Sequence, residues 1–281
     1  MPKQTTNTKL QWWARLIFGF VALNAFLGAM LLIFLPTQTD KLFFWAVRPP
    51  INAGLFGVLY LGGATAVSIA TYRNQWEPVR YLVPILVAAG ILISWVTLLH
   101  LDSFASGIRL AYWLIIYVGA PLLAILIYVF QERRGGNWEV IVPVRPFTRH
   151  IAILSGTIIV IVAVLIILWP ETAVANWTWQ ITPLMIRIFA AWFGAFGAGL
   201  LWFKVERDWQ RLSQIPNLMI AAAGLDLLIL FIHRQTVIVD LNFWFYCSHL
   251  ILFVLIGLLL HWSQTRSPFI NNQISTYEFS E

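Results

Sequence analysis

The chain has 281 residues, of which 60% are hydrophobic and 11% are charged, and its mean hydropathy is +0.78. About a quarter of the residues of a soluble domain are charged, so this composition excludes an ordinary soluble protein and predicts one whose partner is the lipid bilayer. The net charge of +6 would suggest nucleic acid in a soluble protein. In a membrane protein Lys and Arg are first read as topology signals, so no nucleic-acid partner is expected. The single cysteine, Cys247, permits neither a disulfide framework nor a cysteine-based metal site.

Apolar runs recur along the chain at lengths that suit membrane-spanning helices. The first covers residues 12–35 and ends at Pro36. It is longer than the apolar part of a signal peptide, and no cleavage site of small residues follows it. We therefore expect this run to be a membrane span of the mature protein and not a cleaved signal peptide. The other runs cover residues 51–72, 81–101, 111–131, 149–169, 183–203, 216–233 and 243–263. Each is close to the roughly 20 residues that a helix needs to cross the hydrocarbon. The runs lack the alternation of barrel strands, so the sequence predicts an all-α integral membrane protein with eight spans.

The chain also contains an internal duplication. Sliding the sequence by 134 positions superposes, without a gap, Arg15 on Arg149, Pro36 on Pro170, Trp45 on Trp179, Pro49 on Pro183, Gly63 on Gly197 and Tyr112 on Tyr246. This offset predicts two tandem four-helix repeats. Because four is an even number, both repeats enter the membrane in the same direction, and a pseudo-twofold axis along the membrane normal should relate them.

The duplication divides the chain into five segments. Residues 1–11 form a cytoplasmic N-terminal segment, 12–131 the first repeat, 132–148 a cytoplasmic linker, 149–263 the second repeat and 264–281 a cytoplasmic tail. The orientation follows from the basic residues, because 13 of the 18 Lys and Arg fall on the side of the termini and 4 on the other side. Cytoplasmic loops carry such an excess, so the sequence predicts a bacterial inner or plasma membrane protein with both termini in the cytoplasm.

Small residues recur every four positions in the second and sixth spans. Ala190, Gly194 and Ala198 follow this spacing in the sixth span, and Ala53 with Gly57 and Gly62 with Ala66 follow it in the second. Small residues at this spacing allow close helix approach, so we expect both helices near the centre of the bundle, although membrane helices are rich in small residues generally. Leucine should be far more damaging at Gly194 than at Gly136 in the linker.

The two loops that precede these spans share a Trp-x3-Pro arrangement. Their tryptophans are typical of the aromatic belt at the headgroups, and a pair of lids over a cleft is the alternative. The run Phe44-Trp45-Ala46-Val47-Arg48-Pro49-Pro50, with Gly57 and Leu61-Gly62 after it, and the related Trp179-Gln180-Ile181-Thr182-Pro183 with Arg187, resemble an uncharacterised family of bacterial multi-pass membrane proteins. This resemblance implies no function and no site residues.

Candidate functional residues are those present in only one repeat. Asp226 aligns with Leu92, and Arg187 aligns with Ala53, so both intramembrane charges belong to the second repeat. Such charges are costly and usually face a bundle interior or a watery cavity. His233 lies two turns after Asp226 and therefore on the same helical face.

These residues predict a polar cavity that opens to the outside. Its candidate binding residues are Asp226, Arg187, His233, His249, His100 and Tyr246. The alternative is a structural network in which Asp226 bonds to a neighbouring helix and the histidines rest at the interface.

Two metal-based chemistries were weighed against this cavity. Haem ligation would use the histidines, with His249 and His261 on one helix and His150 near the inner end, but two haems need opposed pairs on facing helices. Zinc ligation by His100, His233 and His249 has no compact motif behind it. No metal site is therefore expected, and the cofactor stays open.

As function we favour a small-molecule or lipid-related transporter or binding protein with its site between the repeats, near Asp226, and with proton coupling as an option. The alternatives are a membrane enzyme or redox subunit that uses the histidines, and a noncatalytic subunit of a membrane complex. A homo-oligomer is compatible with each.

Overall fold

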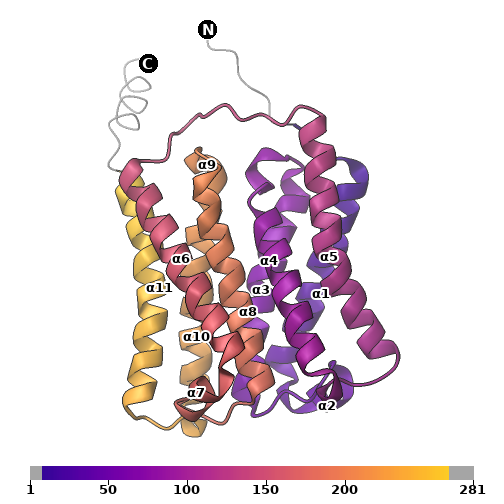
Figure 1. Cartoon of the computed structure of the whole chain (residues 1–281), viewed down its shortest axis with the longest axis vertical. Coiled ribbons are helices and arrows are strands. Elements are labelled where there is room, and N and C mark those ends of the chain that lie inside the picture. The colour runs from indigo at the N-terminus through magenta and orange to yellow at the C-terminus, as the bar shows by residue number, and fades with distance from the viewer. Residues whose placement is uncertain (1–7, 266–281) are drawn as a thin grey trace.

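The structure, a computed structural model that describes residues 8–265, is all-helical (Figure 1). Eight of the helical segments in this range are long and apolar enough to cross a membrane. Their helices are α1 (Trp12–Phe34), α3 (Pro50–Arg73), α4 (Leu82–Leu99), α5 (Ile108–Arg133), α6 (Pro146–Leu168), α8 (Pro183–Leu201), α10 (Gln214–Ile232) and α11 (Leu241–Thr265). The prediction of a multi-pass helical membrane protein is confirmed. Most of the N-terminal segment and of the tail lies outside the described residues.

Short helices mark the two ends of the bundle. The helices α2 (Thr39–Leu42) and α7 (Pro170–Ala175) lie at one end, and α9 (Trp209–Leu212) lies at the other, where the linker crosses between the halves (Figure 1). The longer helices α3, α6 and α8 each begin at a proline, whose missing N–H costs nothing in the first turn. At α8 the Thr182 side chain also accepts a hydrogen bond from the Met185 backbone N–H. Proline thus fixes where these helices begin.

The helices α3 and α8 form the centre of the bundle. Their most apolar windows are 67% and 72% buried, whereas the other six candidate spans reach at most 39%. Helix α3 packs on α1 and α10, and α8 packs on α6 and α4. Helices from both halves therefore meet across the middle, since α4 lies against α8 and α10 against α3. The predicted central position of the second and sixth spans is confirmed.

Glycines make the closest of these contacts. A Cβ atom at Gly194 would lie 2.9 Å from Leu92 and 3.2 Å from Ala163, and one at Gly57 would lie 2.6 Å from Ile33 of α1. The small-residue stripes therefore do bring backbones together at these positions. The prediction was wrong for one of its glycines, because a Cβ at Gly62 would meet no atom within 4 Å.

Candidate functional site

The predicted site residues form separate contacts and are not joined into one hydrogen-bonded cluster in the described part of the chain. Arg187 of α8 donates from Nη1 to Nε2 of His100, 2.8 Å away, and from Nε to the Ile167 carbonyl oxygen at 2.8 Å. Partial burial lowers the pKa of His100, and the nearby Arg187 charge lowers this pKa further. A neutral His100 can accept the proton that Arg187 offers, so the pair joins the second half to the end of α4 without a carboxylate.

Asp226 is the most unusual of the six residues. It lies in α10 with 4% of its surface exposed, and its Oδ1 has no hydrogen-bond partner in the described part of the chain. Tyr246 of α11 lies within electrostatic range of it. The Tyr246 ring packs edge-on against Trp177 and Trp179, with ring centroids 5.1 and 5.2 Å away. A buried carboxyl group thus lies within a candidate membrane span, on a helix that packs against the helix of Tyr246.

The C-terminal end of α10 lies against the N-terminal part of α3. A Cβ atom at Gly54 of α3 would lie 2.9 Å from Ile229 and 3.8 Å from Nε2 of His233. Partial burial lowers the pKa of His233, which favours its neutral form. Ile229 and His233 therefore border the first half of the protein, whereas a shared face of Asp226 and His233 stays a prediction.

The remaining histidines have separate surroundings. His249 packs against Phe193 and Phe253, with ring centroids 5.7 and 5.0 Å away. His261 bonds through Nε2 to Oδ1 of Asn217, and Nδ1 of His150 lies 2.6 Å from the Pro146 carbonyl oxygen. Within residues 8–265 no group of three or more His, Cys, Asp or Glu side chains is placed to hold a metal ion. The zinc alternative therefore lacks an assembled ligand set.

A polar contact joins the start of α3 to the loop before α8. The buried Asn52 side chain donates to the Arg48 carbonyl oxygen at 2.8 Å and to the Gln180 carbonyl oxygen at 3.2 Å, and it accepts from Nε1 of Trp179 at 2.7 Å. One asparagine of the first half thus fixes the loop of the second half. Trp179 is 4% exposed, which differs from a tryptophan that only anchors the protein at the headgroups.

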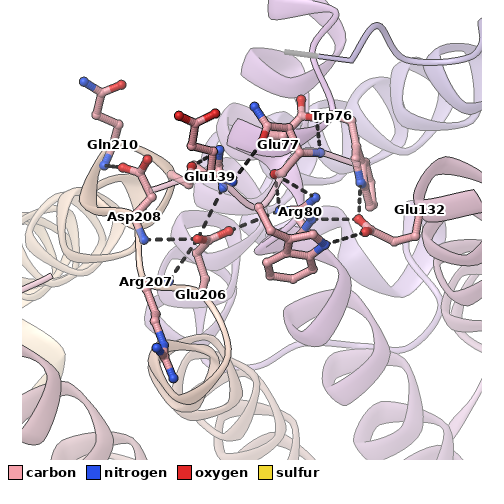
Figure 2. Close-up of polar contacts among 12 residues, drawn as sticks. Trp76, Glu77, Arg80, Glu132, Glu139, Glu206, Arg207, Asp208 and Gln210 are labelled. Carbon is pink, nitrogen blue, oxygen red and sulfur yellow. Dashed lines mark hydrogen bonds and ion pairs between the residues drawn. The ribbon is translucent and has the colours of Figure 1, made fainter. Parts of the chain in front are cut away.

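A second polar region, which the sequence analysis missed, lies at the opposite end of the bundle. Figure 2 shows Arg80 between two carboxylates from different halves, Glu132 at the end of α5 and Glu206 after α8. The Arg80 guanidinium lies 2.8 Å from Oε1 of Glu132 and 3.2 Å from Oε2 of Glu206. It also stacks on the Trp138 ring at 3.8 Å from the centroid. We call Arg80, Glu132, Glu206 and Arg211 the ionic cluster.

Backbone groups complete the ionic cluster. Glu206 Oε1 accepts from the backbone N–H groups of Arg207 and Asp208 and lies 3.5 Å from Nη1 of Arg211. Arg211 donates in turn to the Glu139 carbonyl oxygen in the linker at 2.8 Å. Each buried charge therefore has both an ionic partner and hydrogen bonds, the condition under which burying it is tolerable.

The linker is held by the same region. The buried Glu77 accepts from the Asn137 N–H at 3.0 Å and from the Thr8 N–H at 2.8 Å, while Asp208 accepts from the Ile141 N–H at 2.8 Å. A Cβ atom at Gly136 would lie 2.7 Å from Glu132 and 2.8 Å from Arg80, so the linker passes close to the ionic cluster here. The smaller effect of leucine at Gly136 than at Gly194 stays a prediction. The linker is thus a packed part of the interface between the halves.

A polar cleft lies beside the ionic cluster. Its volume is about 360 Å³, and it is lined by Arg73, Gln75, Pro78, Ile141, Gln210 and Arg211. None of the six predicted site residues lines it. One sequence signal could have pointed here. Four acidic residues lie among the basic residues on one side of the predicted spans, namely Glu77, Glu132, Glu206 and Asp208. The topology rule uses only Lys and Arg and therefore does not register them.

No family model, curated protein or solved structure matches the chain. The function is therefore argued from the residues alone.

Proposed function

We propose that the protein is a transporter or binding protein for a small or lipid-related molecule, with Asp226 as its functional acid. The observation that carries this proposal is the contrast between Asp226 and the other buried charges. Glu77, Arg80, Glu206, Asp208 and Arg211 all have partners, whereas Oδ1 of Asp226 has none among the described residues.

The energetic cost of such a carboxyl group supports a functional role. An ionisable residue at a helix centre costs about 2.5–3.5 kcal/mol on insertion scales, and an unsatisfied buried polar atom costs about 1–3 kcal/mol in proteins. No hydrogen bond to Oδ1 of Asp226 from the described residues offsets this cost. A proton, a cation or a hydrogen-bond donor on a bound molecule would do so, and each belongs to a working cycle of binding and release.

The place of Asp226 in the bundle supports a site between the halves. Its helix α10 packs on α11 of the same half and on α3 of the other half. His233, Arg187, His100 and Tyr246 lie on this side of the bundle as the remaining members of the proposed polar path. His249 lies apart from them, against Phe193 and Phe253, and we assign it the weakest claim.

We also propose the duplicated architecture as the frame of this site. Residue numbers support it, since α6 begins and ends 134 residues after α1. Polar contacts support it as well. The Gln131 amide accepts from the Gln11 N–H and donates to the Lys9 carbonyl oxygen, and Gln264 makes the same two bonds with Arg145 and Pro143. The offset of 134 carries Lys9 onto Pro143 and Gln11 onto Arg145, whereas Gln264 stands one residue before the position that aligns with Gln131. Matching partners with a one-residue shift of the glutamine are compatible with a duplicated gene.

We place both termini in the cytoplasm of a bacterial inner or plasma membrane, on the basis of the Lys and Arg bias. The ionic cluster then faces the cytoplasm, and the contact between Asn52 and Trp179 faces outward. The redox alternative gains no specific support, because His261 and His150 are engaged by Asn217 and Pro146. Partner subunits, including a second copy of the chain, remain compatible with the proposal.

Carbodiimide labelling tests the proposal without knowledge of the substrate. A hydrophobic carbodiimide reacts with a neutral carboxyl group that it can reach from the membrane or from a cavity. We expect labelling at Asp226 in the folded protein in liposomes, read out by mass spectrometry of the peptides, and loss of this label in Asp226→Asn. The variant should keep its fold, because it loses the titratable group and keeps the size and hydrogen-bonding capacity.

The control for reagent activity is the unfolded protein, in which the Asp226 side chain is exposed to the carbodiimide. Asp226 unlabelled in the folded protein but labelled after unfolding would show a sealed, structural acid and would contradict the proposal. Failure of Asp226→Asn to fold would contradict it as well, because that result assigns the acid to packing.

A further inference from the structure

An apolar cleft in the first half is a candidate binding site that the argument about Asp226 does not use. Its volume is about 580 Å³, within the roughly 300–1,000 Å³ of ligand pockets. Side chains of α1, α3, α4 and α5 line it, and they include Leu16, Leu31, Tyr60, Leu86, Trp113 and Ala120. Trp192 of α8 contributes one wall from the other half.

The cleft exists because α1 and α5 stand apart. In the second half α6 packs on α11, whereas in the first half α1 packs on α3 and α5 packs on α4, with the cleft between them. Two contacts cross the gap. Trp13 meets Phe130 edge-on at 5.9 Å toward the linker end, and the Tyr112 hydroxyl donates to Oδ1 of Asn24. Asn24 and Tyr112 themselves line the cleft, so their bond crosses it part of the way along α1, and an apolar guest would pass beside this bond.

The chemistry of the walls selects a hydrocarbon chain. The buried hydroxyls of Tyr60 and Tyr117 are 2.6 Å apart and satisfy each other, and the Asn24 amide also donates to the Phe20 carbonyl oxygen at 2.8 Å. The polar atoms of the lining are therefore engaged, and a guest meets mainly aliphatic and aromatic surface. If the cleft were empty, the side chains that line it would lose dispersion contacts on one side. A hydrocarbon chain in the cleft restores these contacts.

The dimensions of the cleft suit one extended chain. Its lining residues on α1 run from Leu16 to Leu31. At 1.5 Å per residue this stretch measures roughly 22 Å along the helix, more than the roughly 15 Å of one leaflet of a 30 Å hydrocarbon core. A whole acyl chain parallel to the helices fits within this length.

The end of the cleft near α2 carries positive charge. Leu42, Phe43 and Phe44 line this end, directly after the exposed Lys41. Arg109 at the start of α5 donates from Nη1 to the carbonyl oxygens of Asp40, Lys41 and Phe43, at 3.1–3.2 Å. The Asp40 carboxylate lies 3.9 Å from Arg48. Lys41 has no ion pair in the described chain, so its ammonium group is available to an anion.

We propose that this cleft binds one acyl chain of an anionic bilayer phospholipid, whose phosphate lies at Lys41 and Arg109. The aliphatic walls hold the chain, and the charge at the mouth selects the headgroup. A cation close to a membrane surface attracts an anionic lipid with an energy that corresponds to about fivefold in affinity. The site is independent of Asp226, so it stands or falls separately from the proposed transport function.

Native mass spectrometry of the full chain tests this site. The protein is delipidated in detergent and titrated with phosphatidylglycerol or with phosphatidylcholine of the same acyl chains. We expect one tightly bound lipid per chain and a preference of about fivefold for phosphatidylglycerol, which Lys41→Gln removes. The control is Arg234→Gln, which removes an outer-face cation at the end of α10 and should keep the preference.

A second pair of variants tests the position of the chain. Ala120→Trp fills the cleft and should abolish the tight lipid, whereas Val118→Trp, on the exposed face of the same helix α5, should retain it. Equal binding of the two lipids by the parent protein would overturn the proposal. Retention of the lipid by Ala120→Trp, or its loss from both tryptophan variants, would do so too. If Ala120→Trp does not fold, Lys41→Gln decides, and an unchanged preference in that variant overturns the proposal.

Discussion

Two buried acids of this protein differ in how their charge is compensated. Glu206 accepts four hydrogen bonds, from the backbone N–H groups of Arg207 and Asp208 and from the side chains of Arg80 and Arg211. Asp226 Oδ1 accepts none among the described residues. Buried charges that stabilise a fold are paired, so we expect Glu206 to contribute to stability. We propose that the unpaired Asp226 has a functional role.

The ionic cluster yields the first prediction. Arg80→Gln removes the cation between the half-buried Glu132 and the buried Glu206 and leaves each carboxylate with one partner fewer. Breaking a buried pair from one side typically costs about 3–5 kcal/mol, so we expect a large loss in thermal stability. Arg133→Gln, at an exposed arginine of the same membrane side, is the control and should change the melting temperature little. Equal melting temperatures for the parent and Arg80→Gln would show that the cluster does not hold the halves together.

For single helices, the sequence predicts those features that the lipid environment imposes on the chain. The apolar runs predicted all eight spans, because in hydrocarbon only a continuous helix satisfies the backbone. The small-residue stripes predicted α3 and α8 as central helices. The same reasoning failed at Gly62, because the spacing of small residues does not say which of them meets a neighbour.

Close packing of α8 yields a prediction with a matched control. Gly194→Leu would drive a side chain into Leu92 and Ala163, whereas Gly119 in α5 has no atom within 4 Å of a built Cβ. Overpacking a tight contact costs about 1–3 kcal/mol, so we expect lower folded yield and lower melting temperature for Gly194→Leu only. Both glycines lie inside membrane-spanning helices, so helix propensity acts alike on both. Equal damage from the two substitutions would mean that the contact with α4 and α6 is not decisive.

At the scale of the whole molecule, the candidate site could be predicted only in part. Asp226 and Arg187 became candidates because the 134-residue alignment pairs them with Leu92 and Ala53, and their functional role stays a prediction. The partners of Arg187 and the separate surroundings of His249 could not be found, because they depend on how the helices rotate against one another. The ionic cluster was missed for a related reason. Residues from 77 to 211 meet there, and no local pattern joins them.

The membrane topology gives a further prediction for the whole chain. In a Cys247→Ser background, a single cysteine in the linker at residue 140 should react with a membrane-impermeant maleimide only after the membrane is opened. A cysteine at residue 172, in the loop that carries α7, should react in intact cells. The physical basis is the excess of Lys and Arg on the linker side. Labelling of residue 140 in intact cells would invert the orientation and place the proposed polar path on the cytoplasmic side.

The comparison of the two halves provides the most direct test of the functional role of Asp226. The first half has Leu92 at the aligned position, so this helix position can carry an apolar side chain. Asp226→Leu removes a buried carboxyl group whose Oδ1 has no described partner, and relief of such a group is worth about 1–3 kcal/mol. The measurement is the thermal unfolding of purified parent, Asp226→Leu and, as the control for a paired acid, Glu206→Leu. We predict a melting temperature for Asp226→Leu at or above that of the parent, with Glu206→Leu well below it. A loss for Asp226→Leu as large as that for Glu206→Leu would show that Asp226 is a structural acid and would contradict the account.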